Sequence, residues 1–192
     1  MNIRTPLMFV FLGTLCFIIG WRIGSQTSTT AHVSPRTTAD YIHAVVEADR
    51  TFYTQNVVER MEAMLIVTSS ENWRKEKGLP LPAQFLQEAS RNIHVSGKPF
   101  HYQLFSLWPI NPNNGPMNEK ERRELEQVVK YGEVIETEVE LDQQRYFQAI
   151  YPDRAVSRAC ISCHNSHPKS PKQNFNLNDV MGGLKILIPI ND

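Results

Sequence analysis

The residues with the clearest chemical potential lie near the carboxyl end of the chain, in the sequence Cys160-Ile161-Ser162-Cys163-His164. Two thiols separated by two residues are spaced so that each can add across one vinyl group of a haem. The histidine that follows can then offer its imidazole to the iron as an axial ligand. The motif predicts one covalently attached haem c, held by Cys160 and Cys163, with His164 as the proximal ligand.

Other chemistries use the same pair of cysteines. A thioredoxin-like redox site needs C-x-x-C at the start of a helix in a βαβ unit, whereas the prolines near this motif predict a loop. A zinc site needs a fourth ligand, which His167 would supply within one crowded turn. A disulfide between Cys160 and Cys163 is the simplest alternative in an exported protein. The residues alone leave these alternatives open beside the haem.

The first 24 residues are apolar enough to direct the chain to a membrane. Residues 5–24 follow Arg4 and just reach the length of a spanning helix, about 20 residues. A cleaved secretory signal would end in a small-residue pattern that residues 25–31 lack. We therefore expect a single N-terminal transmembrane helix, with a cleaved signal as the alternative, followed by a polar linker over residues 25–38. Either one places the rest of the chain in the periplasm, where c-type haem is attached.

Residues 39–192 show the patterns of one domain. Residues 41–66 predict a helix, which Thr38 or Asp40 would cap. The apolar stripe of this helix is interrupted by Asp49 and Arg50 and consists of Ile42, Val46, Tyr53, Val57, Met61 and Met64. The elements expected after a loop over residues 72–82 are helices over 83–93 and 118–130, strands over 101–108, 133–141, 146–151 and 180–190, and an irregular stretch over 152–178. This order favours the α+β class, with an antiparallel sheet and flanking helices.

The second axial ligand of the iron has several candidates. His43 lies at the edge of the apolar stripe on the first helix, from which it could reach a haem packed against that helix. Met61 and Met64 lie on the stripe itself, but methionines at helical spacing more often fill a core. His43 is therefore our predicted second iron ligand. The remaining candidates are His94, His101, His167 and an open or water-bound position.

Composition and missing motifs exclude several classes of function. Twenty Lys and Arg residues balance twenty Asp and Glu residues, which argues against a nucleic-acid partner because phosphate binding needs a basic surplus. The sequence has neither a G-x-G-x-x-G after a strand, nor a Walker-type loop, nor a G-x-S-x-G. It also singles out no pair of carboxylates and no set of base and nucleophile. We therefore expect that the protein is not an enzyme.

Several short motifs occur in an order that resembles the Tll0287-like domain family. The similarity is carried by YPDRAVSRACISCHNSH (residues 151–167) and DVMGGLKILIP (residues 179–189), and upstream by residues 41–60, 79–84 and 104–114. The resemblance implies a PAS-like fold with a c-type haem, and frequent use as the periplasmic sensor of kinases, cyclases or chemoreceptors. A cysteine is the distal ligand in at least one family member. Residues 31–159 contain no cysteine, so that ligand is missing here.

Together these patterns predict a membrane-anchored monohaem c-type cytochrome that transfers electrons to a redox partner protein or a membrane complex. One alternative is a haem-based redox or gas sensor. Because the sequence ends at Asp192, soon after the last strand, a sensor signal is expected to leave through the N-terminal helix or a separate partner. Another alternative is an accessory haem subunit of a membrane complex. Electron transfer predicts a six-coordinate, low-spin haem, whereas sensing predicts an exchangeable sixth ligand.

Overall fold

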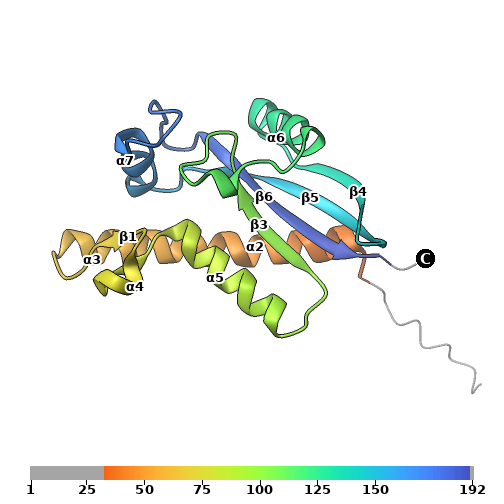
Figure 1. Ribbon diagram of the computed structural model, residues 1–192, viewed down its shortest axis with the longest axis horizontal. Helices are drawn as coiled ribbons and strands as arrows, with labels where there is room; N and C mark the ends of the chain where they lie inside the picture. The colour runs from red at the N-terminus through yellow and green to blue at the C-terminus, as the bar shows by residue number, and fades with distance from the viewer. Residues whose placement is uncertain (1–32, 191–192) are drawn as a thin grey trace, which may run out of the picture. The chain divides into compact units, whose positions relative to one another are not determined.

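A computed structural model describes residues 33–190 of the chain (Figure 1). The predicted membrane segment, residues 1–24, and the predicted linker up to residue 32 therefore lie outside the described residues. Among the helices of residues 33–190, none is both long enough and apolar enough to cross a membrane.

The first helical segment consists of α2 (Pro35–Phe52), a π-helical turn (Tyr53–Val58) and α3 (Glu59–Ala63). The Ser34 hydroxyl accepts a hydrogen bond from the backbone N–H of Thr37 at 3.0 Å, and Pro35 occupies the first helical position. A serine cap followed by proline is a strong helix start. The serine side chain accepts a hydrogen bond from a backbone N–H that has no partner inside the helix, and proline has no N–H that would need one. The predicted caps, Thr38 and Asp40, were therefore wrong, and the helix begins inside the segment predicted as linker.

The buried face of this segment differs from the predicted stripe. Val46 is buried as expected, but Arg50 and Thr54 are buried on the same face, so Arg50 continues the stripe that it was expected to interrupt. The π-helical turn changes the angular position of every later residue. Met64, predicted on the stripe, is the C-cap that follows α3 and has 58% of its surface exposed.

The sheet is antiparallel and has the strand order β3-β6-β5-β4. Its strands are β3 (His101–Phe105), β4 (Ile135–Leu141), β5 (Gln144–Arg154) and β6 (Val180–Pro189). Both ends of each strand lie within three residues of the predicted ends. The predicted α+β class with an antiparallel sheet is confirmed. The central strand β6 pairs with both β3 and β5, which places it at the centre of the core.

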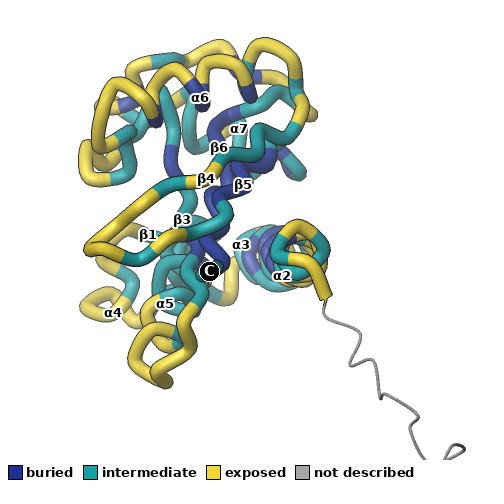
Figure 2. Tube along the Cα trace, turned by 90° about the vertical axis from the view of Figure 1, so that its right-hand side faces the viewer, coloured by how far each residue is buried: buried dark blue, intermediate teal, exposed yellow. Residues whose placement is uncertain are grey.

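Helices cover both faces of the sheet (Figures 1 and 2). α2 and α5 (Pro82–Val95) pack on one face, and α6 (Glu119–Tyr131) packs on the other. Side chains alternate along β5 accordingly: Ala149 and Tyr151 join the core under α2 and α5, whereas Ile150 joins the core under α6. This alternation is the period of two expected of a strand buried on both faces.

Two segments predicted to be irregular contain short elements. The loop before α5 contains β1 (Ser69–Ser70), α4 (Trp73–Glu76) and β2 (Leu79–Pro80), and the connection after β3 contains a short 3₁₀ turn (Pro112–Asn114). The cysteine pair lies on a helix, α7 (Arg158–Ser166), and not in a loop as predicted. The Ser157 hydroxyl caps α7 by accepting from the N–H of Cys160 at 3.4 Å. The fold therefore holds both cysteines and His164 on one rigid turn of helix.

Candidate functional site: the cavity beneath α7

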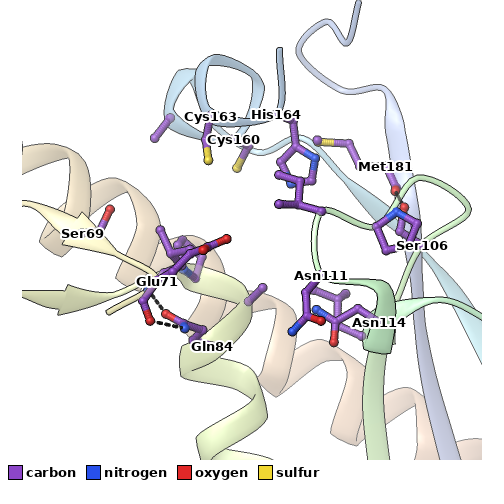
Figure 3. Close-up of a pocket in the computed structure, with 18 of the residues that line it drawn as sticks. Ser69, Glu71, Gln84, Ser106, Asn111, Asn114, Cys160, Cys163, His164 and Met181 are labelled. Carbon is purple, nitrogen blue, oxygen red and sulfur yellow. Dashed lines mark hydrogen bonds between the residues drawn. The ribbon is translucent and has the colours of Figure 1, made fainter. Parts of the chain in front are cut away.

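α7 presents the three motif residues to a common cavity. Figure 3 shows the Cys160 and Cys163 sulfur atoms directed from α7 into this space, with the His164 ring beside them. Residues three and four positions apart lie on one face of an α-helix, so a helical C-x-x-C-H places both thiols and the imidazole on the same side. The structure thus brings together all three residues of the predicted attachment motif.

The cavity has a volume of about 720 Å³, which is in the usual range for a site that encloses a small molecule or cofactor. α7 forms one wall together with Met181 of β6. The opposite wall comes from β1, the start of α5 and the connection after β3. The cavity floor includes Arg50 of α2 and Asp153 of β5.

Both cysteines are free thiols in the structure. Burial, followed by the nearby Glu71, raises the pKa of the Cys163 thiol above its ordinary value. The Cys160 side chain packs beside the cluster of Ala155, Phe175 and Met181, and its sulfur lies 3.5 Å from the Ser157 hydroxyl. Burial and a raised pKa lower the reactivity of a thiol, so both cysteines are shielded from other thiols in solution.

His164 is poised as a neutral ligand. Its Nδ1 atom is buried and has no hydrogen-bond partner within residues 33–190, which is uncommon for a buried polar group and requires an explanation. Burial lowers the pKa of the imidazole, and the charges of Arg50 and His167 lower it further. The ring also packs edge-on against Phe175 with centroids 5.8 Å apart, which fixes its orientation. A neutral, oriented imidazole without an internal partner fits a metal-bound histidine.

The structure gives less support to the zinc and thioredoxin-like alternatives. In the described part of the chain, no three His, Cys, Asp or Glu side chains are grouped so that they could hold a metal ion. His167, the proposed fourth zinc ligand, lies 3.7 Å from a Glu71 carboxylate oxygen. The motif does lie on a helix that comes soon after a strand, as in a thioredoxin-like site. However, the strands before and after this helix, β5 and β6, are antiparallel neighbours. The unit is therefore not the βαβ unit of a thioredoxin-like site.

His43 lies apart from the three motif residues. Its ring stacks on Tyr151 with centroids 3.9 Å apart, and its Nε2 atom is 3.8 Å from a Glu47 carboxylate oxygen. It lines a second, smaller cavity, which is bordered by the same Arg50 and Asp153 that form the floor of the large one. The structure therefore does not bring His43 to the cavity that α7 lines.

A substitution distinguishes the two roles of His43. To reach an iron ligated by His164, the His43 ring would have to leave Tyr151 and pass the Arg50–Asp153 pair. We expect His43→Ala to leave the oxidised and reduced haem absorption spectra unchanged while lowering the melting temperature through lost packing. Tyr41→Ala, on the exposed side of the same helix, serves as the control. If His43→Ala lost a low-spin spectrum that the control kept, His43 would be the second iron ligand after all.

The other predicted ligand candidates do not line the large cavity either. Met64 is exposed, and His94 and His101 face each other with ring centroids 5.4 Å apart. Met61 and His167 are likewise not among the lining residues. The sequence interpretation did not consider Met181, a buried thioether that does line the cavity and packs in the same cluster as Cys160.

A buried ion pair in the cavity floor was also missed. The Nη1 and Nη2 atoms of Arg50 donate to the two carboxylate oxygens of Asp153, while Arg50 Nε is buried without a partner among the described residues. Burial raises the pKa of the Asp153 carboxyl, Arg50 opposes this rise, and Glu47 adds to it. The spacing of Arg50 four residues after Val46 was the available signal for its burial, whereas nothing in the sequence marks Asp153.

The wall opposite α7 is rich in amide side chains. Gln87 donates to the Asn114 side chain at 2.8 Å, and Gln84 donates to the Glu71 backbone carbonyl at 2.9 Å. Asn111 and Asn72 line the same wall. Amide groups are weak ligands for iron but good hydrogen-bond partners for a small polar molecule. Within the described residues, this wall contains no histidine, cysteine or methionine.

Comparisons with known proteins agree with the motifs. The model of one protein family, described as Tll0287-like, matches residues 28–189. Among curated proteins, none matches the chain. One similar solved structure is the crystal structure of the cyanobacterial heme-protein Tll0287, with 14% sequence identity and a TM-score of 0.47, covering 82% of this chain and 97% of that one.

Proposed function

Since the chain belongs to the Tll0287-like family, we propose that the cavity beneath α7 holds one haem c, attached through Cys160 and Cys163 with His164 as proximal ligand. The observation that carries this proposal is the position of His164. Its buried Nδ1 has no internal partner, and it shares one helical face with two free thiols at the cavity wall. Within the α+β architecture we also propose that the domain is PAS-like.

The chain's own residues fit the attachment chemistry. Each thiol would add across one vinyl group, forming a carbon–sulfur bond while its hydrogen moves to the neighbouring carbon, so the addition needs no oxidant. α7 holds the imidazole in a fixed orientation against Phe175. When bound, the haem would supply a one-electron couple of the iron, and the protein would supply an axial ligand through His164.

We propose electron transfer as the function, carried out by a membrane-anchored cytochrome on the periplasmic side, with a redox partner protein or membrane complex and without enzymatic activity. The export pattern of residues 1–24 supports the location. A chain of aromatic rings supports the electron-transfer role. His164 contacts Phe175 with centroids 5.8 Å apart, and Phe175 contacts Trp108 with centroids 5.6 Å apart. These rings lead from the proposed ligand toward Trp108, which is partly buried.

Haem-based sensing is the second candidate, and the amide-rich wall favours it. A wall without histidine, cysteine or methionine suits an exchangeable sixth ligand, because such a position can bind a small molecule. If electron transfer is the function, adding carbon monoxide to the reduced protein should leave its absorption spectrum unchanged. Rapid carbon monoxide binding, seen as a new Soret band, would show that sensing and not electron transfer is the function.

The haem itself is tested on the full chain, matured with a c-type haem attachment system. We expect one haem per chain by the pyridine haemochrome assay and haem staining that survives denaturing electrophoresis. Treatment with acidified acetone should leave the haem on the polypeptide, because thioether bonds are covalent. A protein that is fully folded but carries no haem after this maturation would refute the proposed function.

A further inference from the structure

The segment around α7 has an unusual charge. Residues 154–178, which we name the α7 lobe, contain the four basic residues Arg154, Arg158, Lys169 and Lys172 and no Asp or Glu. Because the whole chain has twenty residues of each sign, the remainder has four more acidic than basic residues. Among the described residues, the lobe that carries the attachment motif is therefore a local concentration of positive charge (Figure 1 shows its place around α7).

The basic groups of the lobe are not neutralised by ion pairs. Arg158 and Lys169 are exposed, and neither has an ion-pair partner among residues 33–190. Arg154 donates only to backbone carbonyl oxygens, those of Asn178 at 3.0 Å and Gly132 at 3.3 Å. Within the described residues, no ion pair therefore neutralises these four cations, and their charge adds to the potential outside the lobe.

Three carboxylates contact the lobe, and all three are already engaged. Asp179, which follows the lobe directly, accepts a hydrogen bond from the backbone N–H of Asn176 at 2.8 Å. Glu59 accepts a hydrogen bond from the backbone N–H of Ala159 at 3.2 Å. Glu71 lies 3.7 Å from His167. None of the three forms an ion pair with an arginine or lysine of the lobe, so they reduce its positive potential without cancelling it.

The aromatic rings that lead away from His164 end under one of these cations. The Lys172 ammonium lies 4.2 Å from the centroid of the Trp108 ring and 4.4 Å from that of Phe175. Phe175 is 3% exposed, so the partly buried Trp108 is the ring of this pair that reaches the surface. The most direct aromatic route from the proposed iron ligand thus opens onto the positively charged surface.

We propose that the α7 lobe is the docking surface for an acidic redox partner protein, which exchanges electrons at the Trp108 side of the lobe. This inference rests on the proposed electron-transfer function. Positive charge around the exit steers a negatively charged partner to the correct face and raises the association rate. A bilayer fits less well, since the lobe exposes a single large apolar side chain, Leu177, among the described residues.

Small inorganic oxidants test the sign of the charge at the exit. In the full-length haem protein in nonionic detergent, we expect ferricyanide, a trianion, to oxidise the reduced haem more slowly as salt rises, by about tenfold. A trication, tris(phenanthroline)cobalt(III), should react faster as salt rises. Arg158→Glu combined with Lys169→Glu should lower the ferricyanide rate at low salt by about tenfold. Because Lys169 also lines the cavity, the variant's haem absorption spectrum must match that of the wild type, and Arg158→Glu alone should lower the rate in the same direction.

A matched control carries the same change in net charge elsewhere. Lys98 and Arg123 are exposed and lie outside the lobe, so Lys98→Glu combined with Arg123→Glu should leave both rates within about twofold of wild type. Equal effects of the two double variants would overturn the proposal, because only net charge would then matter. A protein without haem would instead refute the proposed function, which the absorption spectrum shows before any rate is measured.

The class of partner is tested with two polyanions. Poly-L-glutamate, which imitates an acidic protein surface, should slow the ferricyanide reaction of the wild type and have little effect on the Arg158→Glu, Lys169→Glu variant. Inhibition by phosphatidylglycerol micelles in the absence of inhibition by poly-L-glutamate would overturn the proposal in favour of a lipid surface.

Discussion

A chain in which Cys160 and Cys163 are both replaced by serine should carry no covalently attached haem. Serine hydroxyls do not add across vinyl groups under these conditions, so the variant can at most hold haem through His164. Haem staining after denaturing electrophoresis should fall from one haem per chain to background. Each single variant should retain one thioether bond, with less haem per chain.

The third cysteine of the chain provides a control for these substitutions. Cys16 lies in the apolar segment before the domain, so Cys16→Ser should leave the haem content at the wild-type level. The far-ultraviolet circular dichroism of every variant separates loss of attachment from loss of folding. Undiminished staining in the double serine variant would show that the α7 cysteines are not the attachment sites.

Replacing Asp153 by alanine should lower the free energy of unfolding by about 3–5 kcal/mol, because the buried Arg50 would lose its counter-charge. A guanidinium cannot shed its proton in a protein, so this charge remains buried at every accessible pH. Urea unfolding followed by circular dichroism measures the loss. Because Arg50 and Asp153 form the cavity floor, the haem content of Asp153→Ala should also fall.

Arg50→Met should behave differently, since the group that remains can be neutralised. Burial already raises the pKa of Asp153 above its ordinary value of 3.8, and removing Arg50 removes the one influence that lowers it. A raised folded-state pKa gives stability that is present at low pH and is lost as pH rises through that pKa. The free energy of unfolding of Arg50→Met, relative to wild type, should therefore be higher at about pH 5 than at about pH 8.

The double variant Arg50→Met, Asp153→Leu completes the comparison. Replacing both members of a buried pair by apolar groups is often neutral or stabilising, so it should be more stable than Asp153→Ala. Equal stability losses for Asp153→Ala and the double variant would show that packing, and not an unpaired charge, determines the cost. If the stability of Arg50→Met relative to wild type did not change with pH, burial would not be the cause of the raised pKa of the Asp153 carboxyl.

Local patterns in the sequence were enough to predict most of the fold. α5 and α6 begin and end within two residues of their predicted limits, since each has a clear apolar period and clear end signals. α7 was missed because it is short and is followed by Pro168 and Pro171, which favour a loop. The cap that starts it, Ser157, was visible in the sequence and would have predicted the helix.

The candidate site was predictable only where its chemistry is local. Cys160, Cys163 and His164 lie within five residues, so their spacing alone indicates their common role. Arg50 and Asp153 are separated by 103 positions, and their pairing depends on how α2 packs on β5. The predicted ligand role of His43 depended on the same long-range packing, and the structure places that ring against Tyr151. Contacts of this kind follow from tertiary structure and not from periodicity.

The π-helical turn Tyr53–Val58 determines how this helix can be aligned with those of related chains. Hydrogen bonds from residue i to i+5 accommodate about one residue more than the usual i to i+4 pattern. In a regular helix, a one-residue deletion would rotate everything beyond it by about 100°. Here the deletion would convert the wide turn into an ordinary one and leave both flanking segments facing the same neighbours. A related chain with one residue fewer inside this helix could therefore keep the same packing. An alignment without a gap at that point would match Arg50 or Glu59 to the wrong residue of the related chain.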